Sequence, residues 1–231
     1  MNSLNSLIKN KNKKILFPPG PSSLSKENII GLGPFFGRGD KDYLSLEKIV
    51  LGFLKKMSGQ KHVVPFQGSG SLAIEMMCYN FLNGKILIID TGYYSERIIG
   101  ICENLLELKR ITSIKIVKWN KIEKFRGNYN WVIGCPTETS IGLCVPIKEI
   151  KKLANKVNAK LMLDATASIG LEKNHDYANV LSFSSCKGLF GLTGASFVSY
   201  SIKPRYFKKS FYMNLNNHEN KKMTGPYHIM A

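Results

Sequence analysis

The chain has 231 residues, enough for one sizeable α/β domain or one domain with a small appendage. Its hydrophobic share of 44% is that of a globular protein, and apolar runs such as residues 86–89 are too short to cross a bilayer, so no membrane association is expected. The net charge of +17 comes from dispersed lysines, and no nucleic-acid-binding motif accompanies it. Attraction of small anionic substrates explains the charge at least as well as a nucleic-acid partner does. Nucleic-acid binding is therefore not expected.

The first 14 residues are predicted to form a polar, lysine-rich tail. This tail has no apolar segment of the kind found in secretory signals, so we expect a cytoplasmic protein. Residues 15–231 are expected to form one large domain. The five cysteines include no C-x-x-C pair and the four histidines match no ligand spacing, which predicts reduced thiols and no metal site.

The period of the apolar pattern alternates along the chain between that of helices and that of strands. In chain order it predicts a helix at 45–57, a helix at 71–81, a strand at 85–90, a helix at 95–108, strands at 113–119 and 131–135, a helix at 147–157, and strands at 160–164, 180–183 and 196–200. Such alternation predicts a mostly parallel sheet with helices on both faces. Ligands bind to such sheets at the carboxyl ends of the strands, where the polar clusters of this sequence also fall.

The first polar cluster is the glycine–serine turn at residues 67–71, which leads directly into a predicted helix. Glycines let the backbone approach a ligand, and the exposed N–H groups at a helix start favour an anion. The turn is a phosphate cradle in type, although it lacks the lysine and spacing of a P-loop. A flexible turn with an N-cap serine is an equally good interpretation of this cluster alone.

Two further clusters follow strands. Residues 90–97 contain Tyr93 and Tyr94, and a tyrosine at a strand end can stack on a flat heteroaromatic ring, although most tyrosines serve as core or rim residues. Residues 136–142 contain hydroxyls and a carboxylate that can hydrogen-bond a ring substituent or fix the loop. A capping loop for the next helix is the preferred interpretation of this third cluster alone.

The last two candidate residues are charged side chains near strand ends. Asp164 closes the apolar strand 160–164, where a carboxylate is costly unless it is paired. A protonated heterocyclic nitrogen would satisfy it, and an N-cap role is the alternative. Lys187 stands among small residues between two strands, so its amine can point into a cleft and act as a Schiff-base nucleophile. A lysine in a turn is more commonly just solvated.

The clusters together supply a phosphate cradle, a stacking aromatic, a carboxylate and a lysine, which is the set that pyridoxal phosphate (PLP) requires. Asp164 would keep the pyridine nitrogen of this cofactor protonated, so that the ring can withdraw electrons. Lys187 would hold the aldehyde and later move the proton. The order and combination of the clusters therefore predict a PLP site.

These motifs resemble those of the class V aminotransferases of PLP fold type I, and within them the branch that uses 2-aminoethylphosphonate and pyruvate. The matching segments run in the order of the family: FPPGP (17–21), FQGSGSLAIE (66–75), TGYYSER (91–97), ETSIGLCVP (138–146), DATASIG (164–170) and SSCKGLFGLTGASFV (184–198). The resemblance covers residues 15–231. It implies the large-domain fold of these enzymes, a mostly parallel sheet flanked by helices.

The resemblance also implies roles for particular residues. Ser69, Gly70 and Ser71 would form the phosphate-binding turn, Tyr94 would stack on the cofactor ring, and Thr139 would place a hydroxyl near that ring. Asp164 would pair with the ring nitrogen, and Lys187 would be the Schiff-base lysine. Thr224 would contact the phosphate of a neighbouring subunit. The last contact implies a homodimer with shared active sites. The sequence departs from the family pattern at residues that include Pro136, Ala167 and Cys186.

The activity that the resemblance implies is PLP-dependent transfer of an amino group from 2-aminoethylphosphonate to pyruvate, which yields phosphonoacetaldehyde and L-alanine. The partners would be small amines and 2-oxo acids. Family members continue beyond the point that corresponds to residue 231 through a C-terminal small domain, which carries the arginine for the substrate carboxylate. The alternatives are therefore another class V reaction, such as alanine–glyoxylate-like transamination, or a truncated PLP-binding protein with little or no activity.

Overall fold

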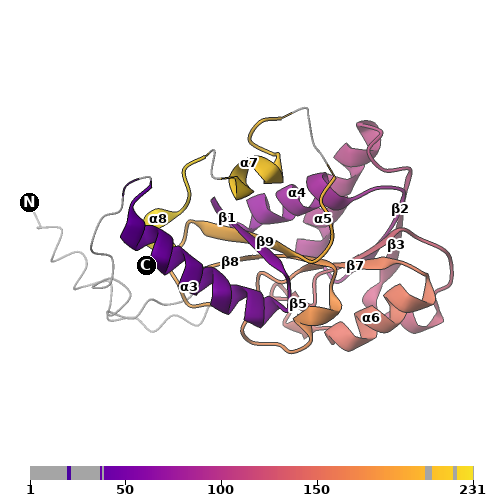
Figure 1. Ribbon diagram of the computed structural model, residues 1–231. Coiled ribbons are helices and arrows are strands. Elements are labelled where there is room, and N and C mark those ends of the chain that lie inside the picture. The colour runs from indigo at the N-terminus through magenta and orange to yellow at the C-terminus, as the bar shows by residue number, and fades with distance from the viewer. Residues whose placement is uncertain (1–19, 22–36, 38, 206–209, 221–222, 231) are drawn as a thin grey trace, which may run out of the picture.

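A seven-stranded sheet forms the centre of the structure, a computed structural model that describes residues 20–21, 37, 39–205, 210–220 and 223–230 (Figure 1). The strands are arranged in the order β1 (His62–Gln67), β9 (Ala195–Tyr200), β8 (Val180–Ser184), β7 (Lys160–Asp164), β4 (Trp131–Gly134), β2 (Lys85–Asp90) and β3 (Ser113–Lys118). All neighbours from β8 to β3 pair in parallel, whereas β9 is antiparallel to both β8 and β1. The predicted mostly parallel sheet is confirmed. Strand β9 reverses because the short turn after β8 leaves no room for the crossover that parallel pairing needs.

Helices cover both faces of this sheet, as predicted (Figure 1). One face carries α4 (Gly70–Phe81), α5 (Tyr93–Glu107) and the short α7 (Leu215–Glu219), and the other carries α3 (Lys41–Ser58), α6 (Ile147–Lys156) and α8 (Tyr227–Met230). The remaining elements are the 3₁₀ turns η1 (Trp119–Lys124) and η2 (His175–Tyr177) and a small hairpin of β5 (Thr137–Glu138) and β6 (Leu143–Cys144). None of the described helices is long and apolar enough to cross a membrane.

The alternation of side chains along the strands divides the core into two layers. In β2, Leu87 and Ile89 pack with α6 on one face, whereas Ile86 and Ile88 pack with α4 and α5 on the other. All four side chains are fully buried. This double burial explains why the central strands consist of continuous apolar runs without a polar alternation.

The bounds of two predicted strands, 85–90 and 160–164, agree with β2 and β7. Helix α3 begins at Lys41, earlier than predicted, because the Asp40 carboxylate caps it by accepting the N–H groups of Asp42 at 2.9 Å and Tyr43 at 3.3 Å. Strand β1 was not predicted, since it contains Pro65, a residue tolerated in strands mainly at a sheet edge.

The structure does not address every prediction about chain organisation. The tail at residues 1–14 lies outside the described residues, as do residues 15–19. The assignment of residues 15–231 to one domain therefore stays a prediction.

Candidate active site

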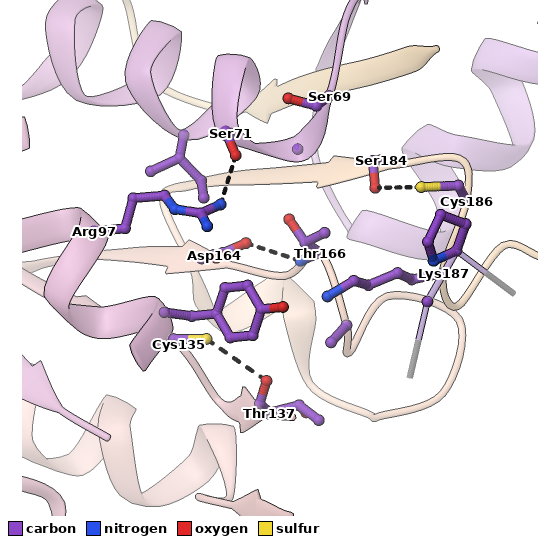
Figure 2. Close-up of a pocket in the computed structure, with 16 residues that line it drawn as sticks. Ser69, Ser71, Arg97, Cys135, Thr137, Asp164, Thr166, Ser184, Cys186 and Lys187 are labelled. Atoms are coloured by element: carbon purple, nitrogen blue, oxygen red, sulfur yellow. Dashed lines mark hydrogen bonds between the residues drawn. The ribbon is translucent and has the colours of Figure 1, made fainter. Parts of the chain in front are cut away.

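Strands β1, β8, β7, β4 and β2 run in the same direction, so their carboxyl ends meet at one edge of the sheet. A cavity of about 190 Å³, the strand-end cavity, lies at this edge (Figure 2). It is lined by Gly20, Pro21, Ser69, Gly70, Ser71, Ile74, Tyr94, Arg97, Cys135, Thr137, Asp164, Thr166, Ala167, Ser184, Cys186 and Lys187. Six of the eight predicted site residues therefore meet in one cavity, although they are far apart in the sequence.

The glycine–serine turn brings the start of α4 to the cavity. Ser69 is the N-cap residue, but its hydroxyl makes no capping hydrogen bond, so it is not committed to the helix. A Cβ atom added at Gly70 would lie only 2.9 Å from the Thr166 Cγ2 atom, so glycine keeps this turn close to the loop after β7. The N–H groups of the first helical turn, together with the helix dipole, make this end of α4 suited to an anion.

Asp164 and Lys187 supply the charged groups of the cavity. Asp164 is the last residue of β7 and is 3% exposed, and its Oδ1 atom accepts the Thr166 N–H at 3.0 Å. Burial raises the pKa of the Asp164 carboxyl, while the Thr166 hydrogen bonds and the charges of Lys187 and Arg97 oppose the rise. The protein alone therefore stabilises the ionised Asp164 carboxylate incompletely, and the carboxylate is suited to a cationic partner.

The Lys187 amine enters the cavity from the turn between β8 and β9. Its Nζ atom lies 4.6 Å from the centre of the Tyr94 ring, a distance at which a cation interacts with the ring face. The stem of Lys187 passes Gly20, where an added Cβ atom would lie 2.6 Å from the Lys187 Cγ atom. The end of the 17–21 motif thus lies against this lysine, whereas residues 17–19 are outside the described part of the chain.

Arg97 also lines the cavity, although it was not predicted as a site residue. Figure 2 shows Arg97 and Lys187 pointing into the cavity from opposite sides. The Arg97 Nη1 atom donates to the Ser71 Oγ atom at 2.6 Å, and the guanidinium carbon lies 5.3 Å from the centre of the Tyr94 ring. The i, i+3 spacing of Tyr94 and Arg97 places both side chains on one face of α5, and this spacing was the sequence signal for Arg97.

Two predicted site residues do not line the strand-end cavity. After β4, the lining residues are Cys135 and Thr137, and the hydroxyl of Thr139 is buried without a hydrogen-bond partner among the described residues. Thr224 lines a second cavity, of about 390 Å³, beside α3 and β1, and the neighbouring Gly225 carbonyl accepts the side-chain amide of Gln67 at 3.1 Å. The roles predicted for Thr139 and Thr224 stay predictions.

Glu138 fixes the loop after β4 to the start of α5. Its carboxylate is fully buried and accepts the Tyr94 N–H at 2.9 Å through Oε2. Its Oε1 atom accepts the N–H of Ser140 at 3.1 Å and the hydroxyl of Ser140 at 2.6 Å. The carboxylate of this cluster thus fixes the loop, one of the two roles that the sequence left open.

We expect Glu138→Ala to lower the free energy of unfolding by about 2–4 kcal/mol, because the Tyr94 and Ser140 N–H groups lose a charged acceptor. Urea unfolding followed by circular dichroism measures the change. The matched control is Glu149→Ala, which removes only the exposed ion pair with Lys152 and should cost less than about 1 kcal/mol. Equal losses in the two variants would contradict the structural role of Glu138.

The titratable groups of the described residues do not form a metal centre. No group of three or more His, Cys, Asp or Glu side chains within these residues is placed to hold a metal ion. All five cysteines are free thiols. Burial raises the pKa of the Cys135 thiol, which keeps it neutral at the edge of the cavity.

Comparison with known proteins gives one family match. A model of the family described as aminotransferase class-V matches residues 58–209, which is more than half of the chain. The chain is 28% identical over 198 residues to the 2-aminoethylphosphonate–pyruvate transaminase of Pseudomonas aeruginosa, covering 80% of this chain and 53% of that protein. It is 29% identical over 204 residues to the bifunctional phosphonoacetaldehyde hydrolase/aminoethylphosphonate transaminase of Clostridioides difficile, covering 81% of this chain and 32% of that protein.

Solved structures show the same fold at low sequence identity. The aspartate aminotransferase of Thermus thermophilus superimposes with a TM-score of 0.81 at 18% identity, over 94% of this chain and 68% of that chain. The alanine–glyoxylate aminotransferase of Nostoc gives a TM-score of 0.78 at 18% identity, over 94% of this chain and 65% of that chain. The chain spans about half the length of curated transaminases such as the Pseudomonas aeruginosa protein, of which it covers 53%.

Proposed function

Since this chain belongs to the class V aminotransferase family, we propose that it is a PLP-dependent transaminase for 2-aminoethylphosphonate and pyruvate. The products would be phosphonoacetaldehyde and L-alanine. The observation that carries the proposal is the assembly of Lys187, Asp164, Tyr94 and the start of α4 around one cavity. The names of the similar curated proteins support this amino donor over the alanine–glyoxylate-like alternative.

The residues of the strand-end cavity fit the chemistry of PLP. The start of α4, with the hydroxyls of Ser69 and Ser71 and no Cβ at Gly70, is suited to the phosphate. Asp164 is buried, and its carboxylate is stabilised by a cationic partner such as a protonated ring nitrogen. The Lys187 amine supplies the covalent attachment. When bound, PLP supplies an electron sink for bond cleavage at the carbon that carries the amino group.

Each of these residues would have a distinct part in the reaction. Lys187 would hold the cofactor between turnovers, and its Nζ atom would then carry a proton away from the amine-bearing carbon of the substrate. The buried Asp164 carboxylate would keep the ring nitrogen protonated through an ion pair. The Tyr94 ring would cover one face of the cofactor and limit the access of water.

We further propose that the active protein is a cytoplasmic homodimer. In this arrangement the Thr224 hydroxyl would contact the phosphate in the partner subunit. The small-molecule substrates would bind at the strand-end cavity. Chromatography with light scattering, with and without PLP, tests the dimer.

The direct test of the function is to incubate the purified protein with PLP, 2-aminoethylphosphonate and pyruvate and to measure alanine and phosphonoacetaldehyde. We expect both products in equal amounts. Formation of glycine from alanine and glyoxylate, without activity on the phosphonate, would favour the alternative transaminase. A visible absorption band of bound PLP without turnover would identify a PLP-binding protein. If added PLP produces no band at all, the assignment of the cavity is wrong.

A further inference from the structure

Arg97 is a cation of the strand-end cavity that none of the predicted roles uses. It projects from α5 and is partly buried between the start of α4 and the aromatic side chains of its own helix. Within the part of the chain that the structure describes, no carboxylate forms an ion pair with it. Its contacts are instead the Ser71 hydroxyl and the rings of Tyr93 and Tyr94, whose centres lie 5.7 and 5.3 Å from the guanidinium carbon.

The hydrogen bond between Arg97 and Ser71 has a fixed direction. A guanidinium can only donate, so the Ser71 Oγ atom must be the acceptor of the 2.6 Å bond from Nη1. A hydroxyl has a single proton, and this contact leaves that proton available to another acceptor. A hydroxyl that accepts a bond from a cation also becomes a stronger donor, because hydrogen bonds in a chain polarise one another.

The position of Ser71 determines what that proton can meet. Ser71 lies in the first turn of α4 and lines the cavity beside Ser69 and Gly70. The backbone N–H groups of this turn already favour an anion there. The contact with Arg97 therefore adds a side-chain donor at the anion-binding end of the cavity, together with a nearby positive charge.

We propose that Arg97 is a positioning residue that holds Ser71 as a hydrogen-bond donor to the phosphate group of the bound cofactor. This inference rests on the proposed function, because PLP is the phosphate-bearing ligand. Arg97 acts through Ser71, and its cation–π contact with the Tyr94 ring helps to keep the guanidinium in place. A positioning role accounts for an arginine that points into this cavity although no carboxylate of the described residues lies at ion-pair distance from it.

The test compares Arg97→Gln, Ser71→Ala and the double variant by titrating each purified protein with PLP and following visible absorbance. We expect each single variant to bind PLP about 10-fold more weakly, the effect of losing one charge-assisted hydrogen bond. Because Arg97 acts through Ser71, Arg97→Gln should have little further effect in the Ser71→Ala background. Pyridoxal, which lacks the phosphate, should bind all four proteins with affinities within about 2-fold.

Arg126→Gln is the matched control, since Arg126 is exposed and contacts only carbonyls of its own loop among the described residues. Its PLP affinity should equal that of the unaltered protein. Thermal unfolding of each variant without cofactor identifies any loss of fold. Additive effects of the two substitutions, or an equal loss of PLP and pyridoxal affinity in Arg97→Gln, would overturn the proposal.

A second measurement separates this proposal from the proposed function. Inorganic phosphate should raise the unfolding temperature of the protein without PLP, and the rise should be smaller in both Arg97→Gln and Ser71→Ala. If the protein does not bind PLP but phosphate stabilises it in this Ser71- and Arg97-dependent way, the function fails and the assignment of the anion site stands. If the protein binds PLP and the two residues affect neither PLP nor phosphate, the function stands and this inference fails.

Discussion

Replacement of Lys187 by alanine is expected to abolish the visible absorption band of PLP-bound protein and to lower transaminase turnover by about 10³-fold or more. The Lys187 amine is proposed both to attach the cofactor and to move the proton. No other lysine lines the strand-end cavity among the described residues. Absorbance spectra and single-turnover assays with 2-aminoethylphosphonate measure the two effects.

Two further variants give this experiment its controls. Lys187→Arg keeps the charge and the stem that passes Gly20 but cannot attach the cofactor, so it should lose the band while it retains the unfolding temperature. Lys148→Ala changes an exposed residue of α6 and should leave band and turnover unchanged. A normal band in Lys187→Ala would show that a different residue attaches the cofactor.

Asp164→Asn is expected to lower turnover roughly 10²–10³-fold while it stabilises the protein without cofactor at neutral pH. The loss of turnover follows because an amide cannot stabilise a cationic ring nitrogen as a carboxylate does. The gain in stability follows because the substitution removes a charge that is fully buried in β7. Steady-state kinetics and thermal unfolding of the same preparations test both effects.

The pH dependence of this stability difference has a defined sign. Burial raises the pKa of the Asp164 carboxyl in the folded protein, so between its unfolded and folded pKa the native state binds the proton more tightly. The stability of the unaltered protein should therefore fall relative to Asp164→Asn as pH rises through that interval. Below the unfolded pKa the carboxyl is protonated in both states, and the difference should be smallest.

Asp42→Asn is the control for the charge change, because Asp42 is exposed in the first turn of α3. It should be neutral or slightly destabilising, since a carboxylate near a helix start is favourable. Saturating PLP should reduce the advantage of Asp164→Asn, because the cofactor supplies the missing cation. A difference between Asp164→Asn and the unaltered protein that does not change with pH would contradict the role of the buried charge.

Much of the site could be predicted from the sequence because its residues follow strands. Continuous apolar runs identified β2 and β7, and the polar residues directly after each run had to lie at one sheet edge once the strands were parallel. This reasoning brought Asp164, Tyr94 and Lys187 together correctly, although they belong to different segments. It depends only on strand direction and needs no knowledge of side-chain rotamers.

Other parts depended on contacts that a linear pattern does not contain. Thr137 and Thr139 are equally plausible as lining residues in the sequence, and the hydrogen bonds of Glu138 decide which way this loop turns. The spacing of Arg97 from Tyr94 places both on one helix face, but the sequence does not reveal the bond of Arg97 to Ser71 on another helix. Strand β1 owes its place to pairing with β9, which lies more than a hundred residues later in the chain.

The pairing of β1 with β9 has a consequence for biogenesis. The turn that begins α4 follows β1, whereas Lys187 lies just before β9, so the two halves of the cavity can meet only after residue 200 has been synthesised. Under the proposed function, PLP would bind only after β9 has joined the sheet. When free PLP is present at 100 times its dissociation constant, its binding would raise the free energy of unfolding by about 2.7 kcal/mol. Under the proposed function, the supply of PLP would therefore influence the stability of the protein as well as its activity.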